Sequence, residues 1–329
     1  MRIALVYDLR EEYQNLGLNE EALAEFDRPE TLDALETALR SAGHHIERVG
    51  SARALVAALA TGARWDLVFN IAEGMVGRSR EALVPALLEA YAIPCLFSDA
   101  VTMAITLDKA LCKRLARDAG LPTTPFCLLE NETDLATCSL PFPLFVKPVA
   151  EGSGKGCDIA SRVENPTALA VRFRDLRRRF GQPVLAEPFL PGREFTVGIV
   201  GNGANPMLHE VAEIVVRNAQ DAGIYGFATK EESASRVHYR RVDDPEARMA
   251  LATGLAIYRL TGCRDAGRID LRSDAAGIPH FLEINPLPGL HPTLSGLPIL
   301  AGFAGWSHAR LILAMVEAAQ ERLAAGCQP

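Results

Sequence analysis

The chain has 329 residues, 49% hydrophobic and 23% charged, which is an ordinary composition for a soluble globular protein of two or three domains. Its net charge of -7 comes from well-mixed acidic and basic residues, which excludes the basic stripe of a nucleic-acid-binding protein. Because no apolar stretch approaches the roughly 18 residues of a membrane span, and the apolar N-terminal run is too short for a signal peptide, we expect a cytoplasmic protein with neither nucleic acid nor membrane as a partner.

The first 100 residues predict alternating strands and helices. Short apolar runs typical of strands lie at residues 3–7, 46–49, 66–71 and 94–97. Helical patterns lie between them, at residues 31–42, 52–60 and 81–90. This alternation indicates a parallel sheet covered on both faces. Since ligands of such sheets bind beyond the carboxyl ends of the strands, residues 8–12 and 70–81 are the expected functional edge.

A helix and a strand that each carry a lysine follow. Residues 107–120 have a helical pattern that includes Lys109 and ends at a glycine followed by a proline two residues later. Residues 144–147 are strand-like and end on Lys147. A lysine at the end of a rigid strand can neutralise phosphate oxygens, although it is also a common surface residue.

A glycine-rich loop at residues 152–156 is a candidate phosphate cradle, because glycines let backbone N–H groups approach an anion. A Walker loop needs Ser or Thr after Gly-Lys and then a helix, but Gly156 follows Lys155, and residues 158–160 are expected to be extended. A dinucleotide fingerprint needs GxGxxG at a strand-to-helix turn, and the spacing here is GxGxG. Two interpretations remain: a hairpin that folds over a nucleotide, or a mobile turn without a binding role.

Two carboxylates follow at strand boundaries. Glu187 ends an apolar run, where a carboxylate beside exposed backbone can meet a ribose or an adenine amino group. Glu194 opens the next strand-like segment. Both are therefore candidates for contacts with a nucleotide.

The C-terminal third contains a predicted β-hairpin. Residues 267–272 and 281–286 alternate between polar and apolar types on both sides of an Asp/Gly-rich turn. Alternation places Arg268 and Asp270 on one face of the first strand, and Glu283 and Asn285 on one face of the second. If the register brings these faces together, the hairpin offers oxygen ligands for Mg²⁺ and a guanidinium for phosphate. A solvated edge hairpin is the alternative.

Seven motifs occur in one order along the chain, and together they resemble the ATP-grasp ligases, in particular the D-alanine:D-alanine ligase family, from about residue 66 to the C-terminus. The motifs are Lys109, Lys147-Pro148, residues 152–156, Glu187, residues 193–197, residues 267–270 and residues 283–289. The resemblance implies an α/β ATP-grasp fold. It assigns residues 1–99 to an N-terminal parallel, Rossmann-like domain, residues 100–186 to a central α+β subdomain with the glycine-rich loop, and residues 187–329 to a C-terminal α+β subdomain, the last two enclosing ATP.

The resemblance also implies roles for individual residues. The nucleotide would be bound by Lys109, Lys147, Gly152, Ser153, Gly154, Glu187, Phe189, Leu190, Glu194 and Lys230. Two Mg²⁺ ions, for which Mn²⁺ could substitute, would be held by Asp270, Glu283 and Asn285, with Glu283 bridging. Arg268, Ser153 and Lys230 would be catalytic, and Lys230 would lie on a lid at residues 217–240. Such enzymes phosphorylate a carboxylate with ATP, and an amine then attacks the acyl phosphate to give an amide, ADP and phosphate.

The chain departs from the family pattern where the first substrate binds. Asp8-Leu9-Arg10-Glu11-Glu12 replaces the family's glycine pair, serine and glutamate, and Glu231 replaces a tyrosine. Residues 70–74 replace a His-Gly-rich loop. We therefore expect small amino-acid or carboxylate substrates that can differ from D-alanine. Candidate ligands for them are Glu11, Glu73 and Glu231 for an ammonium, and Ser295 or Thr293 for the acceptor's carboxylate.

Two other functions compete with a D-alanine:D-alanine ligase-like activity. One is an ATP-grasp ligase for another amino acid, a carrier-bound substrate or a non-amino-acid carboxylate. The other is a nucleotide-binding sensor without catalysis, against which the retention of Arg268, Asp270, Glu283 and Asn285 argues. A homodimer is expected from the family resemblance alone.

Overall fold

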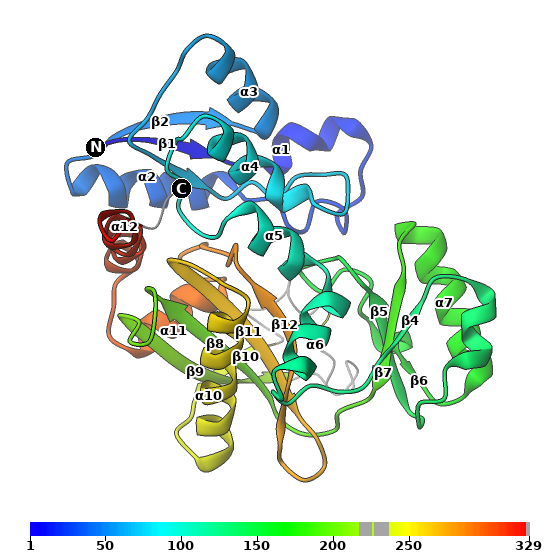
Figure 1. The fold of residues 1–329 in the computed structure, drawn as a ribbon. Coiled ribbons are helices and arrows are strands. Elements are labelled where there is room, and N and C mark those ends of the chain that lie inside the picture. Colours follow the sequence, from blue (N-terminus) through cyan, green and yellow to red (C-terminus); the bar gives the residue numbers. More distant parts are fainter. Residues whose placement is uncertain (217–225, 227–236, 327–329) are drawn as a thin grey trace.

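A three-stranded parallel sheet forms the N-terminal part of the molecule. In the computed structural model, which describes residues 1–216, 226 and 237–326, the order of its strands is β2 (His45–Gly50), β1 (Arg2–Val6), β3 (Leu67–Asn70). Alternate residues of β1 enter two cores. Ile3 and Leu5 pack with α2 (Pro29–Ser41) and α12 (His308–Ala324), whereas Ala4 and Val6 pack with α3 (Ala52–Ala60) and α4 (Leu83–Ala90). The predicted parallel sheet with helices on both faces is confirmed (Figure 1).

Two local predictions are wrong. Residues 94–97 form no named strand but a single parallel bridge between Val68 and Cys95, because Phe97 has a left-handed φ of 74° that ends the extension. Asp158 is extended as predicted, but residues 159–160 are not, because the side chain of Asp158 accepts a hydrogen bond from the N–H of Ala160 and caps a short 3-10 helix, η4 (Ile159–Ser161). The helix predicted at residues 81–90 is divided into η2 (Arg80–Ala82) and α4.

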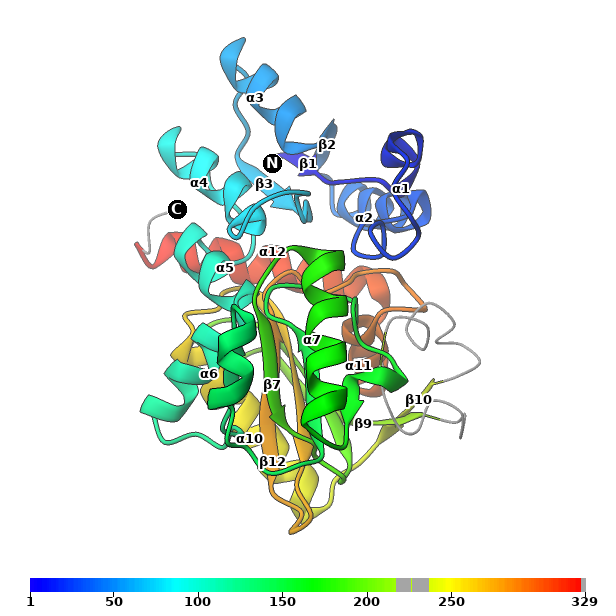
Figure 2. The same ribbon diagram turned by 90° about the vertical axis from the view of Figure 1, so that its right-hand side faces the viewer.

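A four-stranded sheet carries the glycine-rich loop. Its order is β4 (Cys127–Leu129), β7 (Val184–Pro188), β5 (Leu144–Pro148), β6 (Arg162–Val163). Helix α7 (Pro166–Phe180) covers one face through Leu169, Phe173 and Leu176, and Figure 2 shows it lying along the sheet. Helices α5 (Ala100–Leu107) and α6 (Lys109–Asp118) lead into this sheet. The carboxylate of Asp108 caps α6 by accepting the N–H of Leu111.

The C-terminal sheet is five-stranded and antiparallel. Its order is β10 (Val237–Arg241), β9 (Leu208–Val216), β8 (Glu194–Val200), β11 (Ala266–Ser273), β12 (Pro279–Asn285). Ile269 and Leu271 of β11 face α10 (Pro245–Leu260) in a buried core. On the opposite face, a Cβ at Gly198 would lie 2.8 Å from Leu297 of α11 (Gly296–Phe303), so that glycine permits close helix packing. The polar residues of β11 therefore face away from α10.

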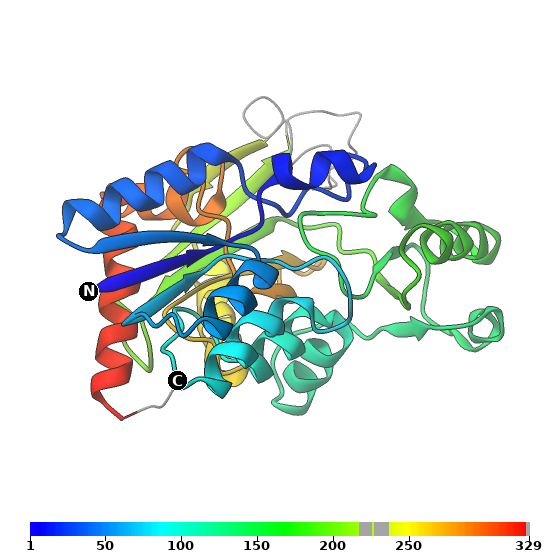
Figure 3. The ribbon, with the colours of Figure 1, turned by 90° about the horizontal axis from the view of Figure 1, so that it is seen from above.

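The C-terminal helix α12 packs against the N-terminal strand β1. Leu311, Ile312 and Met315 share one core with Ile3 and Leu5 of β1, and Figure 2 shows α12 between the N-terminal elements and the C-terminal sheet. Seen from above, the N-terminal elements lie over that sheet, while α7 projects to one side (Figure 3). Among the described residues, no single helix has the length and apolar character to cross a membrane, although α11 and α12, bent by 101°, would qualify as a pair.

Candidate active site

Four polar residues of β11 and β12 meet on one face of the hairpin. Arg268 is paired with Asn285 and Asp270 with Glu283 in the strand register, so the predicted convergence is confirmed. Asp270 is almost fully buried, accepts a hydrogen bond of 2.8 Å from the Thr196 hydroxyl, and accepts two from Arg268, at 3.1 Å from Nε and 2.8 Å from Nη2. The burial of Ile269 and Ile284 on the other face fixes this register, because a slip of one residue would expose them.

Lysine 109 connects this hairpin to the glycine-rich loop. Its Nζ lies 3.2 Å from a carboxylate oxygen of Glu283 and also donates to the carbonyl of Glu151, the residue before the loop. The backbone N–H of Lys109 donates to Val149, which fixes the first turn of α6 against β5. One ammonium therefore lies between the polar face of the hairpin and the start of the loop.

The first pocket lies between the two antiparallel sheets and contains a buried ion-pair cluster. Glu187, at the end of β7, lies 2.8 Å from Lys147 Nζ and 2.7 Å from Lys113 Nζ, and it accepts a 2.6 Å hydrogen bond from Thr124. Burial would raise the pKa of Glu187, but the two ammonium groups lower it to about 2. The carboxylate is thus ionised at neutral pH, and Lys147, whose pKa is raised by Glu187 and Glu283 despite burial, remains a cation in the pocket.

Phe189 and Arg272 line the outer part of the same pocket, and Arg162, which does not line it, also contacts the Phe189 ring. The guanidinium carbon (Cζ) of Arg162 lies 4.6 Å from the centre of the Phe189 ring, and that of Arg272 lies 5.2 Å from it. Arg272 also forms a 3.0 Å ion pair with Glu194. A flat apolar surface beside a carboxylate suits an aromatic base with a ribose, since a planar ring can stack on Phe189 while hydroxyl groups donate to Glu194.

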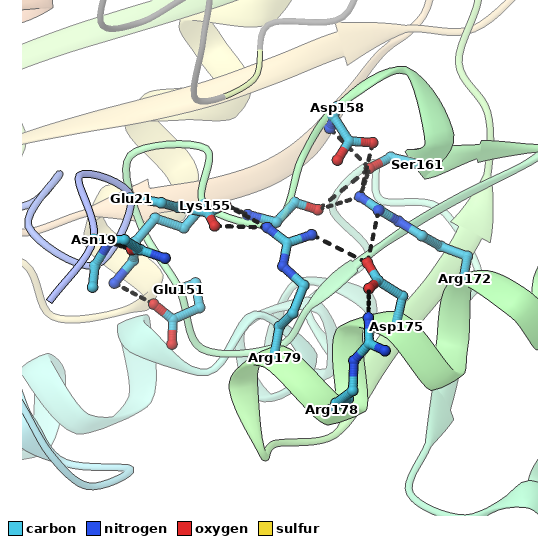
Figure 4. Close-up of polar contacts among 12 residues, drawn as sticks. Asn19, Glu21, Glu151, Lys155, Asp158, Ser161, Arg172, Asp175, Arg178 and Arg179 are labelled. Atoms are coloured by element: carbon cyan, nitrogen blue, oxygen red, sulfur yellow. Dashed lines mark hydrogen bonds and ion pairs between the residues drawn. The ribbon is translucent and has the colours of Figure 1, made fainter.

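Helix α7 holds the glycine-rich loop in place through the side chain of Arg172. Arg172, which is 5% exposed, donates a 2.7 Å hydrogen bond to the carbonyl of Gly156 and a 2.8 Å bond to the Ser161 hydroxyl, and it lies 3.1 Å from Asp158 (Figure 4). Arg179, on the same helix, pairs with Glu21 of the N-terminal segment. The loop is therefore attached to both α7 and the N-terminal part of the chain.

A second N-terminal carboxylate docks on the loop. Glu25 accepts a 2.7 Å hydrogen bond from the N–H of Gly152, pairs with Lys155 at 2.5 Å, and pairs with Arg80 at 2.7 Å. Burial would raise the pKa of Glu25, but Arg80 and Lys155 lower it. This buried network positions the segment that precedes α2 against the loop.

A second pocket opens between the N-terminal domain and the polar hairpin. On one wall it is lined by Arg268, Glu283 and Asn285, and on the opposite wall by Glu25, Asp27, Glu73 and Glu81. Burial raises the pKa of Asp27 and of Glu81 to about 7, and raises that of Glu73 well above its ordinary value, with Glu81 adding to the effect on Glu73. For these three carboxyl groups, the neighbouring cations do not offset the effect of burial on the pKa.

Asp270, Glu283 and Asn285 could hold a hard divalent cation. Two carboxylates lie opposite each other across the hairpin, and Asn285, whose Nδ2 lies 3.5 Å from Asp270, would offer its Oδ1 beside their oxygens. Arg268 and Lys109 neutralise the two carboxylates in the structure. The donor chemistry fits Mg²⁺.

The structure brings most of the predicted residues to the two pockets. The first pocket is lined by Lys109, Lys147, Gly154, Glu187, Phe189, Leu190, Glu194, Asp270 and Glu283. The second is lined by Lys109, Glu73, Gly152, Ser153, Arg268, Glu283, Asn285 and Ser295. Glu11 instead lies exposed on the short helix α1 (Arg10–Tyr13) and lines neither pocket. Lys230, Glu231 and most of the predicted lid lie outside the described residues, except that residues 237–240 belong to β10.

Several residues of the site were missed by the sequence analysis. Lys113 is fully buried and contacts Glu187, and its position one helical turn after Lys109 was an available signal. Tyr239 of β10 lines the second pocket, and Arg272 lines the first. The paired Glu25 and Arg80 lie 55 residues apart, and no local pattern indicated their contact.

Comparison with known proteins identifies close sequence relatives. A protein family described as "D-ala D-ala ligase C-terminus" matches residues 115–317. The D-alanine–D-alanine ligase of Gluconobacter oxydans is 32% identical over 304 residues, which cover 90% of this chain and 96% of that protein.

Solved structures share the fold. The crystal structure of a D-alanine–D-alanine ligase from Bacillus anthracis complexed with ATP has a TM-score of 0.74 and 20% identity, and the match covers 98% of each chain. The VanG D-Ala:D-Ser ligase from Enterococcus faecalis has the same TM-score at 17% identity, with 97% of this chain and 99% of that one covered. At these identities the structural matches establish the ATP-grasp fold.

Proposed function

Since this chain belongs to the D-alanine–D-alanine ligase family of ATP-dependent, ADP-forming ligases, we propose that it joins a carboxylate to an amine through an acyl phosphate formed between its two pockets. ATP would occupy the pocket around Glu187 and Phe189. The carboxylate and amine substrates would occupy the pocket between the hairpin and the N-terminal domain.

The contact between the two pockets supports this assignment most directly. Lys109, Glu151 and Glu283 line both of them. A phosphoryl group leaving the first pocket and a carboxylate held in the second would therefore meet beside one ammonium and one metal-binding carboxylate. Phosphoryl transfer depends mainly on positioning and charge neutralisation, and this junction supplies both.

The proposed reaction has two steps. A carboxylate oxygen of the donor attacks the γ-phosphorus, the bond from that phosphorus to the β–γ bridging oxygen breaks, and ADP leaves. The amine nitrogen then attacks the acyl carbon, the C–O bond to phosphate breaks, and the amine loses a proton as the amide forms. Arg268 and Lys109 would neutralise the transferring phosphoryl group and the tetrahedral oxygen, and Ser153, at the turn of the glycine loop, would orient the donor.

Mg²⁺ bound at this junction would neutralise the phosphate charge and align the γ-phosphoryl group. Asp270, Glu283 and Asn285 would hold it, because they present carboxylate and amide oxygens on one face of the hairpin. Arg268 and Lys109 would then be released from Asp270 and Glu283 for contacts with the phosphates.

Product analysis tests the proposal. Purified protein with Mg-ATP and a mixture of amino acids should release ADP and phosphate only when a substrate is present, and mass spectrometry should detect the condensed product. Release of AMP and pyrophosphate would refute the acyl-phosphate mechanism. Binding of ATP without any product would favour the non-catalytic sensor.

A further inference from the structure

The wall of the second pocket that belongs to the N-terminal domain is rich in acid. Glu25 and Asp27 come from the segment before α2, and Glu73 and Glu81 come from the stretch between β3 and α4. All four line the same pocket as Arg268 and Glu283, and Glu151 continues the wall toward the glycine loop. The substrate that fills this pocket therefore lies between the polar hairpin and a row of five carboxylates.

The nearby cations are mostly committed to other partners. Arg80 donates to Glu25 at 2.7 Å and reaches Glu81 only at 3.6 Å. Lys155 is shared between Glu25 and Glu151. Arg10 donates to the carbonyls of Ala24 and Phe26. Arg28, Lys109 and Arg268 also line the pocket, so what matters is where the cations lie: among the described residues only Arg80 approaches Glu81, at 3.6 Å, and none forms an ion pair with Glu73.

Two carboxylates that line the pocket have no close hydrogen-bond donor among the described residues. Glu81 is 7% exposed, and among the described residues its one polar contact is the 3.6 Å approach of Arg80. Glu73 has no hydrogen bond or ion pair within that part of the chain, although it lines the pocket. Buried polar groups are almost always hydrogen-bonded, so acceptors aimed into a substrate pocket indicate a donor on the substrate.

The position of this wall identifies which substrate it contacts. It adjoins Gly152 and Ser153 of the glycine loop, and it faces Arg268 and Glu283 across the pocket. A donor carboxylate placed at Arg268 for phosphorylation would point the rest of its molecule toward the acids. The α-ammonium of an amino acid would pair with one of Glu73 and Glu81 and leave the other without a close cation.

We propose that the acyl donor is a diamino acid, whose α-ammonium and side-chain ammonium both bind the carboxylate wall formed by Asp27, Glu73 and Glu81. This inference rests on the proposed ligase function and names its substrate class. Two ammonium groups supply six N–H donors in total, which would satisfy the acceptors of both Glu73 and Glu81. The methyl group of alanine would leave Glu81 buried without a donor, a loss that commonly costs tenfold or more in binding.

Matched substrates test the charge requirement directly. Release of ADP and the mass of the product would be measured for 2,3-diaminopropionate against serine, and for ornithine against norvaline, in both enantiomers. Each pair has similar size and differs in one ammonium group. We expect kcat/KM to be at least about tenfold higher for the diamino member of a pair.

Matched variants test the wall. In Glu81→Gln and Glu73→Gln, the preference for the diamino member should fall by about tenfold or more, with little change in KM for ATP. Glu89→Gln, on the exposed side of α4, should retain the preference. A thermal-shift titration of the same amino acids with a non-hydrolysable ATP analogue provides a readout independent of turnover.

The outcomes separate the two proposals. Equal or faster turnover of the neutral amino acids, with ADP formed, would overturn the diamino-acid assignment and leave the ligase function standing. A thermal shift with diamino acids but no product would overturn the ligase function and support the chemistry of the wall. Neither a shift nor a product with any amino acid would overturn both.

Discussion

The Nζ of Lys155 on the glycine-rich loop lies 2.5 Å from the carboxylate of Glu25 in the N-terminal domain, and both side chains are less than a tenth exposed. The N–H of Gly152 and the guanidinium of Arg80 donate to the same carboxylate. A loop suited to phosphate contacts and a wall suited to substrate ammonium groups are thereby joined through one buried ion pair. Movement of either part would disturb the other.

Removal of the Lys155 ammonium should therefore weaken the attachment of the loop. In Lys155→Met, Glu25 keeps Arg80 but loses a buried cation, and we expect the free energy of unfolding to fall by about 3 kcal/mol, as measured by urea denaturation. Lys155→Arg, which keeps the charge, should lose less. An unfolding curve of Lys155→Met that coincides with that of the natural protein would show that the pair contributes no net stability.

Glu283 lies at the junction of the two pockets, and its neutralisation should stop catalysis without unfolding the protein. In Glu283→Gln the proposed bridging metal ligand loses its charge, and we expect kcat to fall by about 10²–10³-fold. Glu210→Gln, a change at a carboxylate of β9 that pairs loosely with Arg241, is the control and should retain activity. If both variants release ADP at comparable rates and keep the melting temperature of the natural protein, Glu283 is not a metal ligand.

The hairpin could be predicted because the alternation of polar and apolar residues along each strand determines which side chains share a face. Side chains alternate with a period of two, and the apolar residues Ile269, Leu271 and Ile284 had to share a buried face, so the polar residues were left on the opposite one. The pairing of Asp270 with Glu283 does not follow from the turn alone, because the register shifts by one residue between Asp270 and Leu271. The parallel sheet of the first 100 residues followed in the same way from the alternation of strands and helices, whereas the ATP-grasp fold was implied by the family resemblance.

The substrate wall could not be predicted in this way, because its residues meet only through tertiary packing. Glu11 follows β1 and was chosen for that position, but the chain turns through α1 and η1 (Gln14–Leu16) before it returns to the pocket at Glu25 and Asp27. Neither of these residues has a local signature that distinguishes it from a solvated surface carboxylate. The position of Glu25 depends on Arg80 and on the glycine loop, which are distant in sequence.

Arg172 should act as a positioning residue for the glycine-rich loop. Its guanidinium holds the carbonyl of Gly156 from α7, so Arg172→Met should release the end of the loop and raise KM for ATP by about tenfold, with a smaller effect on kcat. Arg174→Met is a matched control, because Arg174 lies two residues away on α7 and pairs with Glu132 on the surface. Steady-state kinetics with varied ATP would measure both. If the loop is positioned without Arg172, the two variants should have the same KM for ATP.

The ion-pair cluster around Glu187 should make stability depend on pH in a defined window. The pKa of Glu187 is lowered from an ordinary value near 4.5 to about 2, so the folded state gains stability from this ionised carboxylate above pH 4.5 and loses that gain as the pH falls toward 2. A depression of this size corresponds to about 3 kcal/mol.

Glu187→Gln should therefore be less stable than the natural protein at pH 7, and the difference should shrink as the carboxylate of the natural protein becomes protonated. Urea denaturation at a series of pH values would measure it, and Glu132→Gln, at a surface carboxylate, should show no comparable trend. A difference between Glu187→Gln and the natural protein that stays constant from pH 7 to pH 3 would mean that Lys113 and Lys147 are held by packing and not by the charge of Glu187.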